Sequence, residues 1–211
     1  MLRPQARFLL RVSALLIGLL VLWWFVLLSP LLFLLRQSAE LCASVAFGGS
    51  ARFIDVTATG DWTVHVPIET VIPMSPGQPA PVAVHSIDFD LARADAGAFT
   101  FGLPVLWAIL VAAPEIRRGR PLALGTAAMM AVELVLFLVY VELFAHKTAA
   151  QWAQSQDAVS NWFYRFADYL LVSVIPYVAP FAVAIGVSGE LRGQIFGWAA
   201  GQPAARRPRK K

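Results

Sequence analysis

Four long apolar runs dominate the chain. Each is long enough, or nearly so, to cross the ~30 Å hydrocarbon core of a bilayer, which takes roughly 20 helical residues. The interiors of the first, second and fourth runs hold no charged residue, whereas the third carries Glu133 and Glu142. The pattern predicts transmembrane helices at residues 12–36, 96–114, 121–146 and 168–189.

The segment between the first two runs has the shorter period of β-strands. Residues 53–57 and 62–66 are β-branched or alternate between apolar and polar, with Gly60-Asp61 between them as a turn. Residues 82–91 alternate in the same way. We predict a small β-rich domain of three or four strands over residues 37–95. A sheet of this size is marginal alone, so we expect it to lean on the membrane or on a partner.

A shorter polar segment, residues 147–167, separates the third and fourth runs. It contains Trp152, Trp162, Phe163 and Tyr164. Aromatic rings are favoured at the level of the lipid headgroups, and the spacing of these four suits a short helix lying there.

The distribution of positive charge predicts the orientation. All but five of the 17 Lys and Arg residues lie at residues 1–11, 115–120 and 190–211. Such clusters mark cytoplasmic segments, so we predict that both termini are cytoplasmic and that residues 37–95 and 147–167 are periplasmic. The first apolar run is longer than the roughly 7–15 residues of a signal-peptide core, so we expect an uncleaved anchor.

Composition agrees with a mainly α-helical membrane protein. Hydrophobic residues make up 58% of the chain and charged residues 14%, whereas about a quarter of a soluble domain is charged. The net charge of +4 sits beside apolar runs, which favours anionic lipid over nucleic acid as its counterpart. The single cysteine, Cys42, excludes an internal disulfide and a CxxC-type zinc site. We therefore expect neither a metal nor a cofactor.

Glu133 is the first candidate functional residue, because it lies midway along the third predicted helix. An ionised carboxylate is expensive there unless it is paired or hydrated. It could bond a partner's helix, serve as a proton or ion site, or remain protonated and bond a neighbouring helix. Small residues let helices approach closely, so we predict Glu133 together with Gly102, Gly125 and Gly186 as helix–helix or partner contacts.

Cys42, His146 and Arg165 form a second, weaker constellation. Each lies near the predicted outer end of a helix. Transpeptidases use a thiolate nucleophile, a histidine base and an arginine that stabilises the oxyanion. The spacing of these three residues is not specific, so we predict no catalytic residues and keep the constellation as an alternative.

Short motifs at the helix ends point to a known family. The second helix is entered at Gly102-Leu103-Pro104, the fourth contains Pro176 and Pro180 as Pro-x-x-x-Pro, and the Trp-rich first helix ends in Ser29-Pro30. With the order of helices and outer domain, these motifs resemble the small exosortase H-associated membrane proteins. The resemblance implies an inner-membrane accessory of an exosortase, a system that cleaves and sorts exported proteins carrying a C-terminal tripartite signal.

The predicted function is thus a non-enzymatic inner-membrane accessory that docks an exosortase-type enzyme or its sorted substrates, with the lipid bilayer around it and no nucleic acid. Two alternatives stay open: a membrane thiol peptidase or transpeptidase using Cys42, and a small ion-coupled transporter subunit using Glu133. An exosortase itself is not expected. Those enzymes have more spans and the chain order Cys, Arg, His, whereas here His146 precedes Arg165.

Overall fold

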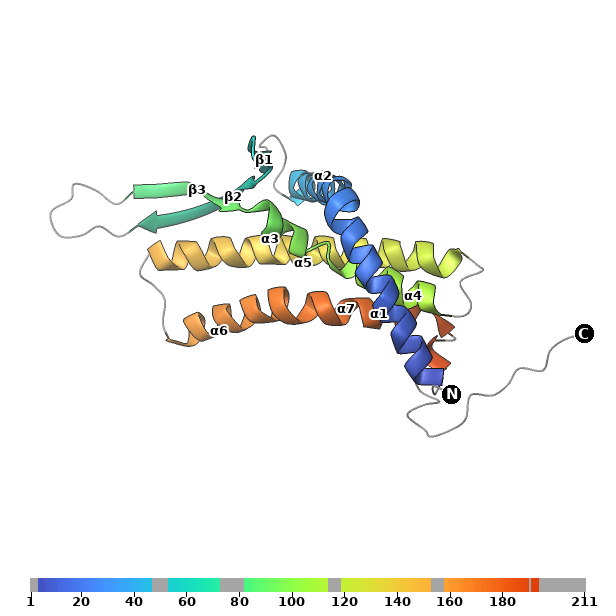
Figure 1. Cartoon of the computed structure of the whole chain (residues 1–211). Coiled ribbons are helices and arrows are strands. Elements are labelled where there is room, and N and C mark those ends of the chain that lie inside the picture. The colour runs from blue at the N-terminus through green and yellow to red at the C-terminus, as the bar shows by residue number, and fades with distance from the viewer. Residues whose placement is uncertain are drawn as a thin grey trace, which may run out of the picture.

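The computed structural model describes residues 4–46, 53–72, 82–113, 119–152, 158–189 and 191–193. These residues form a mostly helical structure with one small sheet (Figure 1). The elements, including two π-helical turns labelled η, are α1 Pro4–Leu22, η1 Trp23–Leu27, α2 Leu28–Ala46, β1 Ile54–Val56, β2 Trp62–Ile72, β3 Val82–Leu91, α3 Arg93–Ala98, α4 Gly102–Ala112, α5 Arg120–Trp152, α6 Ala158–Tyr169, η2 Leu170–Val174 and α7 Ile175–Val187.

Four helical stretches are long and apolar enough to cross a membrane, as the sequence predicts. They are Phe8–Val45, Arg93–Ala112, Arg120–Gln151 and Ala158–Val187, of 38, 20, 32 and 30 residues. At 1.5 Å per residue the third is about 48 Å long, well beyond the ~30 Å core of a bilayer. The helices therefore continue past the ends of the apolar runs into the polar residues that follow.

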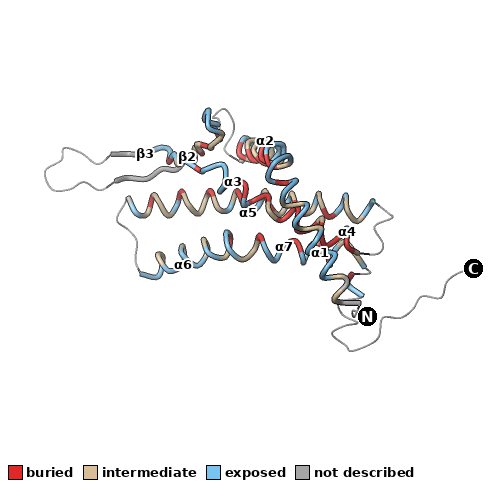
Figure 2. The backbone as a smooth tube through the Cα atoms, viewed as in Figure 1, coloured by how far each residue is buried: buried red, intermediate tan, exposed pale blue. Residues whose placement is uncertain are grey.

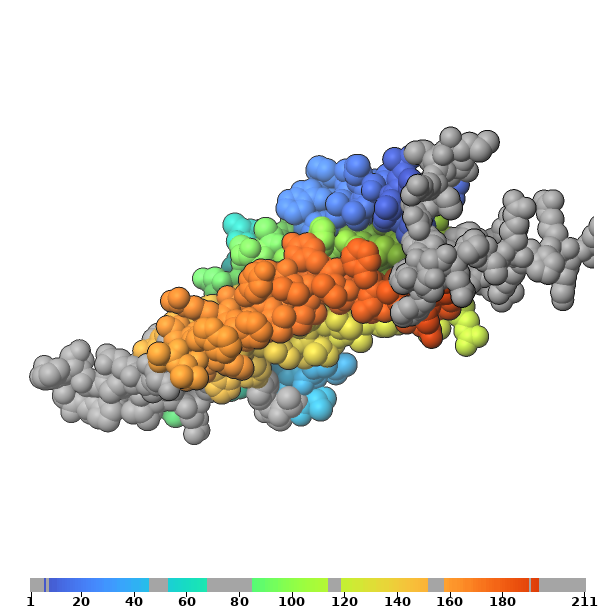
Figure 3. Space-filling view, turned by 90° about the horizontal axis from the view of Figure 1, so that it is seen from below, coloured from blue at the N-terminus to red at the C-terminus, as the bar shows by residue number. Residues whose placement is uncertain are grey.

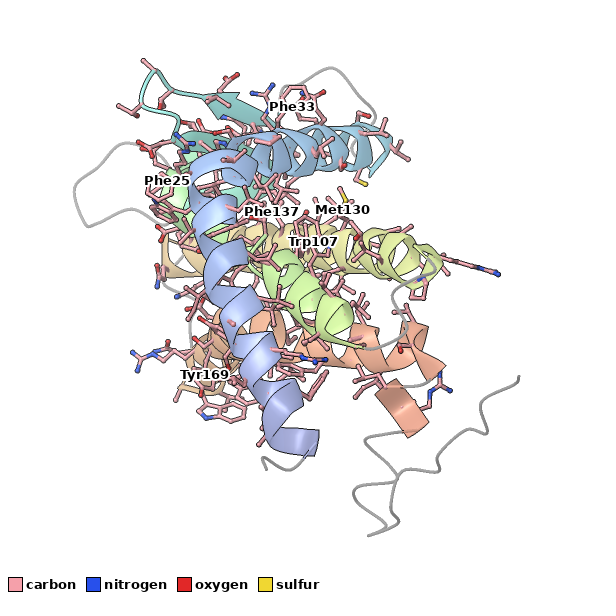
Figure 4. The ribbon with its side chains drawn as sticks, turned by 45° about the vertical axis from the view of Figure 1, so that its right-hand side comes forward. Phe25, Phe33, Trp107, Met130, Phe137 and Tyr169 are labelled. Atoms are coloured by element: carbon pink, nitrogen blue, oxygen red, sulfur yellow. The ribbon has the colours of Figure 1, made fainter. Side chains whose placement is uncertain are left out.

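The first helical stretch is bent rather than straight. α2 turns away from the direction of α1 beyond the π-helical turn η1 (Figures 1 and 4). Pro30 follows directly in the first turn of α2. Its ring has no N–H for the carbonyl of Val26 and collides with that carbonyl, which bends a helix, as a π-turn also does. The bend lets α2 cross α5 while α1 packs beside α4.

The three strands form an antiparallel sheet in the order β1-β2-β3, between the first and second candidate spans. Its register sets apolar partners on one face, such as Val64 opposite Phe89 and Val66 opposite Ile87. That face packs on α5, where the ring of Trp62 meets the ring of Phe137 edge-on at 5.7 Å. The sheet gains its core from the helix it lies on, in keeping with the expectation that so small a sheet is not stable alone.

The helical bundle has α4 at its centre, in contact with α1, α5 and α7. Most of α4 is buried, and Figure 2 shows it largely in red among paler neighbours. α6 and α7 run along α5 (Figure 3). The outward faces of the other helices stay apolar: Phe25 on η1 and Phe33 on α2 are 79% and 58% exposed (Figure 4). Side chains of this kind suit contact with acyl chains.

Candidate functional site

Glu133 is one of the most deeply buried polar residues of the described chain, with 3% of its surface exposed. It lies on α5 and lines a cavity of about 150 Å³ between α2, α4 and α5, which we call the Glu133 cavity. Ser38 and Thr100 supply the other polar side chains of its wall, and the remaining lining residues are apolar. The protein thus places one carboxyl group in an otherwise largely apolar hollow.

The carboxyl group of Glu133 is only partly satisfied by the chain itself. It interacts with the backbone N–H groups of Gly102 and Leu103, in the first turn of α4. Among the described residues, however, Oε1 of Glu133 has no hydrogen-bond partner. A buried acceptor without a partner costs about 1–3 kcal/mol, so the group is primed to accept a hydrogen bond from outside the chain.

Two of the three predicted contact glycines lie at helix crossings inside the chain. A Cβ atom on Gly102 would overlap Cε of Met129 on α5. A Cβ on Gly125 of α5 would lie 2.9 Å from Cδ1 of Leu110 on α4. Gly186 differs, because it is exposed and a Cβ there would meet no described atom within 4 Å. Gly102 and Gly125 therefore bring α4 against α5.

A buried hydrogen-bond chain fixes the segment that precedes α4. The indole N–H of Trp23 donates to Oγ1 of Thr100 at 3.1 Å, and that hydroxyl donates to the carbonyl of Gly97 at 3.0 Å. Trp23 belongs to the π-turn η1, so this chain ties the bend of the first helix to the start of α4. The first turn of α4, which faces Glu133, is positioned by it.

The weaker constellation of Cys42, His146 and Arg165 is spread over three helices. Cys42 lies half-buried on α2. His146 is exposed on α5, with Nε2 3.8 Å from Oε2 of Glu142 one turn earlier. Arg165 lies on α6 and lines a different cavity, whose walls include neither of the other two. Among the described residues, no hydrogen bond, ion pair or shared cavity joins any two of the three.

That cavity, which we call the Tyr140 cavity, holds about 430 Å³ between α3, α5, α6 and η2. Asp95, Tyr140, Arg165 and Asp168 line it. Sequence reasoning did not single out this cluster beyond Arg165, because its members are far apart in the chain. The sequence carries one indication of the cluster, because Asp95 and Asp168 each stand immediately before an uncharged run.

The polar face of the sheet carries a further cluster. His65 lies between two carboxylates, with Nδ1 2.9 Å from Asp88 and Nε2 3.3 Å from Asp55. The hydrogen bond with Asp88 raises the pKa of His65 above its ordinary value, and Asp55 adds to the effect. The sequence alone does not single out His65, because only the strand register brings it opposite Asp88. Among the residues described, no group of three His, Cys, Asp or Glu side chains, this one included, is arranged to hold a metal ion.

The fold and the buried carboxyl group define the class of protein. Four candidate membrane spans, a small sheet between the first two, and a buried carboxyl group inside the bundle describe a multi-span membrane protein. Within this class, residues 2–190 match the family of exosortase H-associated membrane proteins, and the chain belongs to that family. No curated protein and no solved structure matches the chain.

Proposed function

We propose that this protein is a non-enzymatic accessory of the bacterial inner membrane that docks an exosortase-type sorting enzyme or its substrates. The observation that carries the proposal is the family match over residues 2–190, because the family is described as associated with exosortase H rather than as an enzyme.

The proposal includes an orientation. Both termini and residues 115–120 are cytoplasmic, and residues 37–95 and 147–167 are periplasmic. The distribution of Lys and Arg supports this arrangement. The sheet then lies at the periplasmic surface of the membrane on the far half of α5, and its polar face meets the sorted protein or the enzyme.

Inside the membrane, Glu133 accepts a hydrogen bond from a helix of the partner. Its Oε1 atom is buried and lacks a partner in the described chain, and the Glu133 cavity leaves room beside it. Gly102 and Gly125 act within the chain by holding α4 against α5, whereas the exposed Gly186 offers a flat site for a partner helix.

The test is co-purification of the co-expressed exosortase with tagged variants in mild detergent. Glu133→Leu should recover several-fold less enzyme, up to about tenfold, since a typical hydrogen bond contributes about 0.5–1.5 kcal/mol. Membrane insertion and thermal stability should be kept, because leucine fits an apolar wall.

Glu142→Leu is the matched control. It removes a carboxylate from the same helix, but that carboxylate is more exposed and lies beside His146. The control should recover as much enzyme as the native chain. Equal recovery with Glu133→Leu and Glu142→Leu would remove Glu133 from the contact.

A further inference from the structure

The Tyr140 cavity combines both signs of charge with aromatic walls. Asp95 and Asp168 contribute carboxylates, Arg165 contributes a guanidinium, and Tyr140 and Tyr169 contribute rings and hydroxyls. Its volume of about 430 Å³ falls in the range of small-molecule sites, roughly 300–1,000 Å³. A ligand that carries a positive and a negative group on a short spacer matches this lining.

Among the described residues, the charged side chains of the cavity do not form ion pairs with one another. Within the part of the chain that the structure describes, no ion pair joins Arg165 to Asp95 or Asp168, although the three line one space. Asp168 and Asp95 both lie near enough to the hydroxyl of Tyr140 to act on it electrostatically. Asp95 and Arg165 are exposed and Asp168 is half-buried, so all three charged groups are accessible to a ligand that enters the cavity.

The cavity lies where the hydrocarbon core of a bilayer would end. Tyr140 is about 30 Å along α5 from Arg120, at 1.5 Å per residue, which is one core thickness. Asp95 and Asp168 stand at the last charged positions before two uncharged runs. Tyr169, labelled in Figure 4, is 61% exposed beside the cavity, as an aromatic ring at a headgroup boundary commonly is.

The helix is also distorted at this point. Ser173 and Val172 of the lining belong to the π-turn η2 between α6 and α7. π-turns occur frequently at functional sites, because they widen the helix and re-aim its side chains. In Figure 3 the segment of α3 and α4, in green, borders the orange helix that contains η2.

We propose that the Tyr140 cavity binds the headgroup of a zwitterionic, primary-amine phospholipid of the ethanolamine type. The ammonium group donates to Asp95 and Asp168, the phosphate accepts from Arg165, and the acyl chains leave along the exposed apolar side of Val172. The shared chemistry, an ammonium joined to a phosphate, is also present in free glycerophosphoethanolamine, and the test separates the two sources. The proposal rests on the membrane embedding and does not depend on an exosortase.

The test is binding of phosphatidylethanolamine to the purified full-length protein in detergent, followed by native mass spectrometry. Phosphatidylglycerol, which has the phosphate without the amine, should bind about tenfold more weakly or worse. Free glycerophosphoethanolamine should bind more weakly than the lipid. Equal binding of phosphatidylethanolamine and phosphatidylglycerol would overturn the proposal. Equal binding of free glycerophosphoethanolamine and phosphatidylethanolamine would show that the site recognises the soluble headgroup rather than the lipid.

Variants locate the site. The double variant Asp95→Asn/Asp168→Asn, and separately Arg165→Gln, should each lower the affinity for phosphatidylethanolamine about tenfold. Glu142→Gln and Arg192→Gln, which remove like charges outside the cavity, should leave it unchanged. Ala98→Trp fills the cavity from the exposed side of α3 without removing a charge, and should block binding even if the charge variants fold poorly. Undiminished binding by Ala98→Trp would overturn the site.

Discussion

A Cβ atom on Gly102 would lie 3.0 Å from Oε1 of Glu133, closer than side-chain atoms normally approach. The missing side chain of one residue therefore makes room for the carboxylate of the other. The space at Gly102 lets Glu133 lie against the first turn of α4, whose backbone N–H groups interact with its carboxyl group. Among the described residues, Oε1 of Glu133 has no hydrogen-bond partner.

Gly102→Ala should destabilise the protein. The new methyl group overlaps Cε of Met129, whose flexible side chain is fully buried and has to repack, and overpacking of a core costs about 1–3 kcal/mol. Thermal unfolding of the purified protein in detergent would show a lower Tm. Gly186→Ala is the control, because open space surrounds Gly186 and alanine favours helix, so its Tm should be equal or slightly higher. A Gly102→Ala protein as stable as native would contradict the close approach of α4 and α5.

Thr100→Val should also destabilise the protein, since it leaves the buried indole N–H of Trp23 without its acceptor. The expected loss is about 1–3 kcal/mol of unfolding free energy. A double-mutant cycle with Trp23→Phe measures the pair itself. If the two single effects simply add, to within about 0.5 kcal/mol, the hydrogen bond contributes nothing.

The sheet should respond to pH through His65. Its pKa is raised from the ordinary 6.5, mainly by the hydrogen bond with Asp88. The protonated ring is thus favoured in the folded sheet. The stabilisation is fully present below pH 6.5 and is lost as the pH rises through the raised pKa of the folded state. The pair is exposed enough that the effect stays below about 1 kcal/mol.

NMR titration of His65 provides the measurement. Asp88→Asn should move its pKa back toward the ordinary value, whereas Asp90→Asn, whose carboxylate accepts from Thr63 instead, should move it much less. Equal effects from the two variants would mean that Asp88 is not the partner that raises the pKa of His65.

Cys42→Ala should leave the processing of sorted proteins in living cells unchanged. Cys42 lies half-buried on α2 and is not among the residues that line the cavity of Arg165. The measurement is the ratio of processed to unprocessed substrate on an immunoblot. Loss of processing in Cys42→Ala, with the protein still present in the membrane, would revive the thiol-enzyme alternative.

Much of the fold could be predicted from the sequence, because uninterrupted apolar runs and alternating residues report directly on helices and strands. The four candidate spans and the three strands follow from these patterns. The bend after η1 was not predicted, since its cause combines a π-turn with Pro30 inside an otherwise uniform apolar run.

The side-chain clusters were harder to predict, because they join residues far apart in the chain. The Trp23–Thr100 bond spans 77 positions, and the position of His65 between two carboxylates depends on the strand register. Glu133 was identifiable because a carboxyl group in an apolar run stands out alone. The Tyr140 cavity had no such signal, since charged residues at the ends of helices are common.

The central claim is that the protein works bound to an exosortase, and affinity purification from the native membrane tests it most directly. The tagged protein would be isolated in mild detergent and its companions identified by mass spectrometry. The account predicts that an exosortase, or proteins that it sorts, are enriched over a preparation from an untagged strain. A pure preparation without either, from membranes that contain both, would contradict the account.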